Sequence, residues 1–338
     1  LLVALPPLKG VKGADVITSG VEYFRGYNWS YDVVVDDYDG TNACIVGVSP
    51  IFSGVVMVPS TLGGYRVGDL GKIGEIEQPN LTEISIPSGL NLWSSGWFHE
   101  KCPNLTSISC YTEPGAHSWL LSENGMVLID WNGTGLKILC SPPNSPITQY
   151  SVPLNVKYLS YHAFTSCRNL EVIQIHEGVE LDVAVFAYCS NLKSVVLPSD
   201  AKEIPRDLCW ECESLSDIII PDTVNVIGSY AFGGCLNRFV VIPSAVEEIG
   251  THAFASSLGP KAIYFLGRPP MKCDMEAFCY ATNNIGYYRF ENRHAWHEVA
   301  DKYGRWCGLN LKCTGVEPHG CDWANGTIEL GWYGVATN

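Results

Sequence analysis

A repeat of 22 to 23 residues limits the fold of this chain more than any other feature of its sequence. The segment LSDIIIPDTVNVIGSYAFGGC (215–235) contains a short apolar strand, a Pro turn, a second apolar run and a Cys. Residues 192–212 repeat this order, and residues 238–257 repeat it with Ser257 in place of the Cys. A period of about 20 to 50 residues indicates a solenoid or a related array, in which one copy buries its apolar face only against the next copy. The turn prolines are Pro198, Pro221 and Pro243.

Looser copies extend the array toward the N-terminus. Residues 80–102 and 169–189 keep the strand and the Cys, and the stretch between them carries a hairpin inserted around 111–135. Two strand-like ends, at Cys110 and Cys140, flank this insertion. The chain therefore holds about seven copies, and their period lies within the range of about 20 to 29 residues found in leucine-rich repeats.

The residues of one copy predict how it folds. Leu215, Ile218 and Ile220 point inward, because successive side chains of a strand alternate between its two faces. Pro221 then ends the strand, because proline has no N–H to donate to a sheet. The gaps between strands are too short and too rich in Pro and Gly for the helices of about ten residues that an α/β enzyme fold requires. We expect a curved, right-handed solenoid that is mostly strand, with a parallel sheet on one face and a cap at each end.

The repeats resemble those of a known family. The pattern IPxxVxxIGxxAFxxCxxLxxIxIP, met at 218–235 and 240–257, is similar to the BspA-type leucine-rich repeat of bacterial surface and secreted proteins. Residues 55–67 resemble the segment that opens such arrays, and 262–281 resemble their closing coils. The resemblance thus spans about 55–285.

Two residues depart from the pattern of the family. Arg238 stands where an inward Leu is expected, and Cys209 stands where a Phe is expected, which affects local packing rather than the fold. The resemblance implies a non-catalytic, secreted or cell-surface scaffold for adhesion or protein binding, without a cofactor. It implies no particular ligand, because the ligands of the family vary.

The charge of the chain excludes one class of partner. The sequence carries 21 Lys and Arg against 35 Asp and Glu, a net charge of -14. Binding to nucleic acid requires a cationic surface that neutralises phosphates, so we discard this class. The longest apolar stretch also falls short of the roughly 20 residues that a membrane-spanning helix needs.

The segments on either side of the array differ from it in sequence. We expect residues 1–54 to form a β-rich cap, 55–285 to form the repeats, and 286–338 to form a second cap and the start of a following segment. One helix is expected near 291–303. The opening residues, 1–13, are compatible with the remnant of a signal peptide or with an ordinary first strand. Because both ends of the chain are abrupt, we expect it to be a piece of a longer protein.

Cysteine accounts for 14 residues and gives two expectations. Five cysteines recur at one repeat position, where we expect small buried side chains, because stacked coils offer no tetrahedral metal site. This cysteine ladder comprises Cys102, Cys167, Cys189, Cys212 and Cys235. Disulfides are candidates between Cys110 and Cys140 and among the cysteines crowded near the C-terminus. The latter are Cys273, Cys279, Cys307, Cys313 and Cys321.

Motifs of catalysis and metal binding are weak. The motif HAWHE (294–298) places His294 and His297 on one helical face near Glu291, a candidate set of metal ligands. A zinc protease requires HExxH, which this motif does not match. A cap helix that buries Trp296 explains the same spacing. DDYDGTN (36–42) lacks the Gly and Glu positions of a calcium loop, which favours a hairpin turn. The sequence has no nucleophile elbow and no phosphate-binding loop. We therefore expect no enzyme activity, no metal and no cofactor.

The outward residues of the strands are unusually apolar. On coils about 5 Å apart they form a continuous stripe with charged residues at its edges, which is typical of a partner site. The preference of branched residues for strands explains the same pattern without a partner, and a terminal segment folded over the stripe is a third interpretation. The candidate face comprises Val172, Val196, Ile219, Phe239, Val241 and Tyr264, edged by Glu171, Asp217 and Lys193.

Three functions are compatible with these features. The leading hypothesis is a secreted or surface-displayed scaffold whose sheet face binds a host, partner-cell or matrix protein. The alternative is a structural subunit that self-associates through the ends of the solenoid or through the sheet face. The third is an accessory part of a larger secreted enzyme.

Overall fold

The structure is a computed structural model, and the chain divides into two compact units. One unit comprises Leu1–Leu170 and Val179–Cys189, and the other comprises Glu171–Gly178 and Ser190–Asn338. The described residues are 16–36, 40–70, 76–90, 97–112, 120–131, 135–236, 239–255, 262–279, 285–307 and 309–314. The segment considered as a signal remnant, the turn at Asp39, and Cys321 lie outside them. In the part of the chain that the structure describes, no helix has the length and apolar character needed to cross a membrane.

The first unit begins with a five-stranded sheet in the order β1-β2-β3-β6-β5. β1, β2 and β3 are antiparallel, and β1 turns into β2 at Arg25 and Gly26, both of which have positive φ. A two-residue turn with positive φ at both positions matches the twist of a hairpin. The strands are β1 (Val16–Phe24), β2 (Tyr27–Asp36), β3 (Gly40–Ser49), β5 (Thr61–Leu62) and β6 (Tyr65–Asp69).

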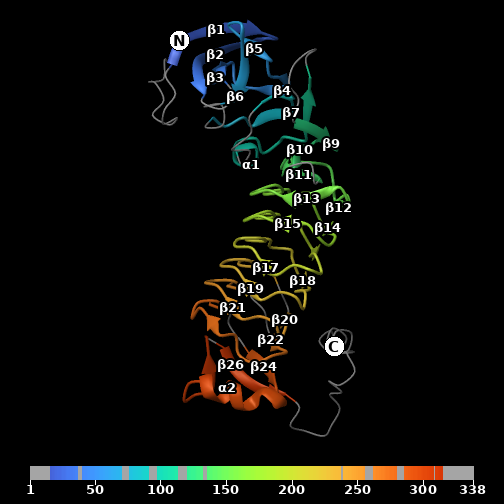
Figure 1. Cartoon of the computed structure of the whole chain (residues 1–338), viewed down its shortest axis with the longest axis vertical. Helices are drawn as coiled ribbons and strands as arrows, with labels where there is room; N and C mark the ends of the chain where they lie inside the picture. Colours follow the sequence, from blue (N-terminus) through green and yellow to red (C-terminus); the bar gives the residue numbers. More distant parts are fainter. Residues whose placement is uncertain are drawn as a thin grey trace. The chain divides into compact units, whose positions relative to one another are not determined.

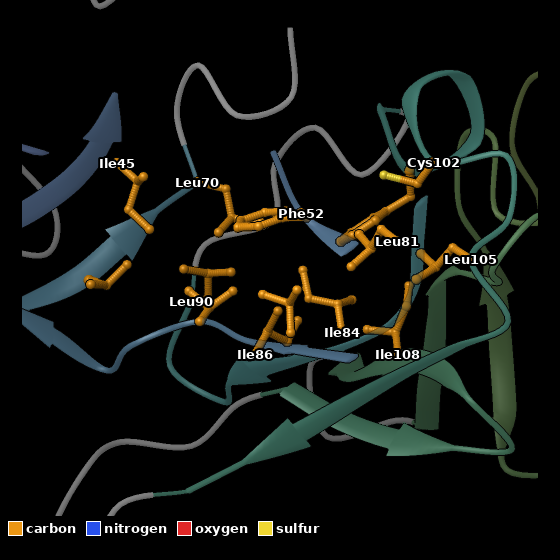
Figure 2. Packing of buried hydrophobic residues seen from close by; sticks show 14 of the residues in the cluster. Ile45, Phe52, Leu70, Leu81, Ile84, Ile86, Leu90, Cys102, Leu105 and Ile108 are labelled. Carbon is orange, nitrogen blue, oxygen red and sulfur yellow. The ribbon is translucent and has the colours of Figure 1, made fainter. Parts of the chain in front are cut away.

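A parallel sheet of three strands, β4-β7-β8, carries the core of the first unit. The ring of Phe52 is fully buried, with its centroid 5.3 Å from that of Tyr27 and 5.4 Å from that of Trp29. Figure 2 shows Phe52 beside Leu70, with Leu81 in the same apolar cluster. The elements are β4 (Ser53–Met57), β7 (Asn80–Pro87), α1 (Trp97–Lys101) and β8 (Ser107–Tyr111).

A hairpin lies between β8 and the later coils of the first unit. β9 and β10 are antiparallel and meet at Asn124 and Gly125, which both have positive φ. β11 pairs antiparallel with β10 and parallel with β13, so the order β15-β13-β11-β10-β9 joins the hairpin to the coils. The strands are β9 (Leu120–Glu123), β10 (Met126–Trp131), β11 (Gly135–Cys140), β12 (Gln149–Ser151), β13 (Val156–Leu159) and β15 (Glu180–Leu181).

Each coil of the second unit adds short strands to two parallel sheets. β14, β16 and β18 pair in one sheet, and β17, β19, β21 and β23 pair in the other, where Figure 1 shows successive strands stacked. The sequence predicts one sheet, and the second forms because the run after each Pro turn, such as Val226 and Ile227, is also extended. The strands are β14 (Val172–Gln174), β16 (Ser194–Val196), β17 (Glu203–Ile204), β18 (Asp217–Ile218), β19 (Val226–Ile227), β21 (Glu248–Ile249) and β23 (Lys272–Cys273).

A further sheet and a short helix close the second unit. The strand order is β20-β22-β24-β26-β25, and all pairs are parallel except β25 with β26. Trp296 lies in the helix α2, within the stretch 291–303 where the sequence predicts a helix, and is fully buried, with its ring centroid 4.7 Å from that of Phe265. The elements are β20 (Phe239–Ile242), β22 (Ala262–Phe265), β24 (Ile285–Arg289), η2 (Phe290–Asn292), α2 (Arg293–Val299), β25 (Arg305–Trp306) and β26 (Leu309–Thr314).

Aromatic side chains stack between successive coils of the second unit. The rings of Phe232 and Phe254 lie 5.5 Å apart, and those of Phe254 and Phe278 lie 5.6 Å apart, both pairs nearly parallel. Leu215, Ile218 and Ile220 are also buried, as the alternation of the strand predicts. The inward residues of each copy are therefore covered by the same residues of the next copy.

Close approach of the coils explains the Gly in the repeat pattern. A Cβ added at Gly228 would lie 2.5 Å from the backbone N of Arg206, and one added at Gly250 would lie 2.6 Å from the backbone N of Ser229. Both contacts are closer than real Cβ atoms allow, so the backbones pack against each other without a side chain between them. Cys209, which departs from the pattern, is fully buried at the position where a Phe is expected.

Candidate partner-binding face

The short strands on one side of the second unit place alternate side chains outward. In β16 the side chain of Val195 is buried, whereas that of Val196 is 48% exposed. One coil further, Ile218 is buried and Ile219 is 64% exposed. Burial of a side chain of this size contributes roughly 1.5 to 3 kcal/mol. Because Val196 and Ile219 are exposed, they do not contribute this burial free energy to the stability of the fold.

The register of the strands aligns these outward residues in two runs, one in each of two sheets. Val195 faces Ile218, so the residues that follow them occupy one position on adjacent coils. Val241 faces Tyr264, and Tyr264 faces Tyr287 in the closing sheet. In each of the first three copies the outward residue lies two positions before the Pro of the turn. We define the outer stripe as Val196, Ile219, Val241, Tyr264 and Tyr287.

Two tyrosines extend the outer stripe onto the closing sheet. The rings of Tyr264 and Tyr287 are stacked, with centroids 4.9 Å apart and planes 17° apart. Burial, and after it the neighbouring Tyr287, raises the pKa of Tyr264 further above neutral, so its hydroxyl stays protonated into the alkaline range. Tyr287 is absent from the face predicted from the sequence, although it lies one period of 23 residues beyond Tyr264. No Pro follows Tyr287 two positions later, so the sequence lacks the residue that marks this repeat position in the first three copies.

The other residues of the predicted face form a second row rather than one stripe. Val172 faces Ser194, and Ser194 faces Asp217. Phe239 faces Ala262 in the closing sheet. Val172 and Phe239 are half-buried, so this row offers less apolar surface than Val196 and Ile219 do. Asp217 lies in β18, and its side chain is outside the described residues.

Charged residues border the two rows. The ammonium of Lys193 lies 2.9 Å from a carboxylate oxygen of Glu171, one coil earlier. Both side chains are largely exposed, at 57% and 40%, and an exposed pair of this kind contributes about 0 to 1 kcal/mol. The pair therefore fixes two side chains at the edge of the face without a large effect on stability.

The turns that follow the strands carry a row of carboxylates. Glu177, Asp200 and Asp222 are all exposed and lie on successive copies. Both carboxylate oxygens of Asp200 accept hydrogen bonds from the backbone N–H of Gly178 at 3.1 Å. The hydroxyl of Ser199 donates to the carboxylate of Glu177. This margin of the face is therefore acidic and is held in place by contacts between coils.

Six copies of one known repeat occupy the middle of the chain. Residues 143–260 match the family described as BspA type Leucine rich repeat region. These residues are BspA-type leucine-rich repeats. The match lies within the wider span, about 55–285, that resembles the family, and the rest of that span stays a prediction. The matched residues, 143–260, include Val172, Val196, Ile219 and Val241 of the candidate face.

Solved structures similar to this chain have low sequence identity to it. The pneumococcal vaccine antigen PcpA is similar with a TM-score of 0.52 and 14% identity, over 88% of this chain and 99% of that one. A leucine rich cell surface protein of Faecalibacterium prausnitzii has a TM-score of 0.46 and 15% identity, over 75% and 96%. No curated protein matches the chain. The likeness to PcpA concerns the fold alone, and the repeat assignment rests on the family match.

The side chains of the cysteine ladder are buried. All five members, Cys102, Cys167, Cys189, Cys212 and Cys235, are at most 3% exposed. The thiol of Cys189 donates to the carbonyl of Phe164 at 3.0 Å, and the thiol of Cys235 donates to the carbonyl of Cys209 at 3.1 Å. Each of these thiols satisfies a carbonyl of the preceding coil, a role that the spacing of the cysteines could not reveal.

The remaining candidates do not assemble into a reactive site. Cys110 is a free thiol, so the proposed disulfide with Cys140 is not formed in the structure. His297 Nε2 lies 3.1 Å from the hydroxyl of Tyr288, and Glu291 pairs with Arg289. Over the described ranges, no three His, Cys, Asp or Glu side chains gather closely enough to hold a metal ion.

Proposed function

We propose that this chain is a non-catalytic scaffold that binds a protein partner through the outer stripe. One observation carries the proposal: Val196 and Ile219 are 48% and 64% exposed on adjacent coils of a unit whose inward residues are buried. Adjacent apolar side chains on a rigid sheet form a surface that a partner can cover at little conformational cost. Tyr264 and Tyr287 add aromatic surface of the kind enriched in interfaces.

The margin of the stripe indicates the chemistry of the partner. Glu177, Asp200 and Asp222 place carboxylates along one side of the face, and the chain as a whole carries a net charge of -14. Complementary charge speeds association and disfavours partners of like charge. The surface thus fits a protein segment with apolar side chains at its centre and Lys or Arg beside them.

The proposal includes a secreted or cell-surface location and a role in adhesion. The match of residues 143–260 to BspA-type leucine-rich repeats supports it, because the resemblance to this family implies a surface or secreted binding scaffold. The repeats also supply the physical requirement, because stacked coils hold many outward side chains in fixed positions. No reaction is assigned to the chain.

A photo-crosslinking experiment tests the location of the binding surface. Ile219→p-benzoylphenylalanine places a photoreactive ring on the outer stripe, and Met271→p-benzoylphenylalanine places one on an apolar residue that is 78% exposed outside the stripe. Each variant is irradiated with a panel of purified extracellular matrix proteins. We expect crosslinks from position 219 only. Equal crosslinking from both positions, or none from position 219, would contradict the proposal, and crosslinks between two copies of the chain would favour self-assembly instead.

A further inference from the structure

Two cysteines from distant parts of the second unit meet at its C-terminal end. Cys273 ends β23, where it faces Ile249 of the preceding coil. Cys307 directly follows β25 in the closing cap. The Cys307 thiol donates to the backbone carbonyl oxygen of Cys273 at 3.5 Å, and a hydrogen bond links the two thiols, both of which are free in this structure. A disulfide requires two cysteines whose Cα atoms lie roughly 4.4 to 6.8 Å apart, so two thiols within hydrogen-bonding range of each other are candidates for one.

The neighbouring cysteines have other surroundings. The thiol of Cys313 contacts the hydroxyl of Tyr288 and lies 3.9 Å from the carbonyl oxygen of Thr314. Cys279 follows the buried Phe278, and burial raises the pKa of its thiol. Among the cysteines crowded near the C-terminus, the described part of the structure therefore singles out Cys273 and Cys307.

We propose that Cys273 and Cys307 form a disulfide that ties the last coil of the repeats to the C-terminal cap. The bond would join residues 34 apart in the sequence. It would fasten the chain directly beside Trp306, whose ring packs against Trp296 with centroids 5.0 Å apart. The crosslink would hold the aromatic cap against the end of the array, where a solenoid otherwise frays.

The two thiols are unequal, which assigns them different parts in the reaction. The hydrogen bond with Cys273 lowers the pKa of Cys307, whereas the same contact and burial raise the pKa of Cys273. Cys307 is therefore the attacking thiolate, because the thiolate is the nucleophile in disulfide exchange. Both residues are half-buried rather than enclosed, so a small oxidant can reach them.

The oxidant is a low-molecular-weight disulfide such as oxidised glutathione. The Cys307 thiolate attacks one sulfur of this disulfide and releases one glutathione thiolate. Cys273 then loses its proton and attacks the Cys307 sulfur, which releases the second glutathione. Two electrons pass from the protein thiols to glutathione disulfide, one S–S bond forms within the protein, and two glutathione thiols are produced.

Peptide mapping tests the pairing directly. The full chain is equilibrated with reduced and oxidised glutathione, its remaining thiols are alkylated, and it is digested with trypsin without reduction. Cleavage after Lys272, Arg289, Arg305 and Lys312 separates residues 273–289 from 306–312. We expect these two peptides to appear joined, two hydrogens lighter than their sum, and to separate on reduction.

A variant distinguishes Cys273 from Cys279, which shares its tryptic peptide. Cys279→Ser should retain the joined peptides, and Cys273→Ser should lose them. As a second readout, oxidation should raise the thermal midpoint of the wild-type chain and of Cys313→Ser, but not that of Cys307→Ser. The proposal is overturned if the peptides stay separate after oxidation, if Cys279→Ser abolishes the link, or if Cys307 is found joined to Cys313 or Cys321. The mapping does not depend on any partner protein, so its outcome is independent of the proposed binding function.

Discussion

At the scale of single residues, His99 is a buried histidine with a strongly lowered pKa. Its side chain lies within the first unit and is only 4% exposed. Burial, and after it the nearby charge of His162, lowers its pKa from 6.5 to about 3. A buried imidazole of this kind must stay neutral for the unit to remain folded. The free-energy cost of protonating His99 in the folded state therefore lowers the stability of the first unit at acidic pH.

We predict that the first unit loses stability as the pH falls from about 6.5 toward 3. The unfolded chain binds a proton at the ordinary pKa of histidine, whereas the folded chain does so only near pH 3. The contribution of His99 is therefore complete above pH 6.5 and declines throughout this window. Chemical denaturation at several pH values measures this slope. His99→Gln should reduce it, whereas His294→Gln, at an exposed residue of α2, should not; equal slopes in both variants would contradict the assignment.

The sequence predicts single residues well where the repeat constrains them. The burial of Leu215, Ile218 and Ile220 follows from alternation, and the turn prolines mark the coil boundaries. Tyr287 escapes prediction because its copy lacks the Pro turn that reveals the position. The hydrogen bond from Cys189 to Phe164 escapes it as well, because it depends on coil spacing, which the residue types do not encode.

At the scale of elements, contacts between copies stabilise strands that are only two to four residues long in the second unit's coils. β17, β19 and β21 each contain two residues, too few to be stable alone. Their side chains and the stacked Phe residues bury one another from coil to coil. The predicted parallel sheet is present, whereas the second sheet is not predicted, because strands so short give too few alternating residues to be recognised in the sequence.

We predict that Phe254→Ala strongly destabilises the second unit. The Phe254 ring is buried between Phe232 and Phe278, so truncation removes two stacking contacts and leaves a cavity. Replacement of a buried Phe by Ala typically costs about 3 to 5 kcal/mol in the free energy of unfolding. Denaturant unfolding followed by circular dichroism measures this loss. Phe290→Ala, at a ring that is 39% exposed, is the matched control and should cost much less; similar losses in both variants would rule out the stack as the cause.

At the scale of the whole molecule, the chain combines BspA-type repeats with a β-rich N-terminal region and an aromatic C-terminal cap. The solenoid class is predictable because the repeat recurs in order and spacing over many residues. The limits of the segments at 54 and 285 stay predictions, since they rest on composition and turn residues alone. The arrangement of β1, β2 and β3 could not be predicted in detail, because these strands have no repeat to align them.

We predict that Trp296→Ala loosens the second unit from its C-terminal end. The Trp296 ring is fully buried against Phe265 and Trp306, and its Nε1 donates to the carbonyl of Gly267 at 3.1 Å. In a solenoid each coil is stabilised by its neighbours, so loss of the cap should spread from the last coil inward. Hydrogen exchange should rise in β22 and β24 before it rises in β16. Uniform exchange throughout the unit, or no change relative to Tyr303→Ala at an exposed ring, would contradict a capping role.

The most direct measurement of the central claim is the affinity of a matrix-protein partner for three forms of the chain. These are the wild type, the stripe variant Ile219→Asp with Val241→Asp, and the control variant Met271→Asp with Met275→Asp. The two control methionines are 78% and 82% exposed and lie outside the outer stripe, so both variants add the same charge. We predict that the stripe variant binds at least about tenfold more weakly, a loss of about 1.4 kcal/mol, while the control variant matches wild type, with all three equally folded by circular dichroism. Wild-type affinity in the stripe variant, or an equal loss in the control, would show that the outer stripe is not the binding surface.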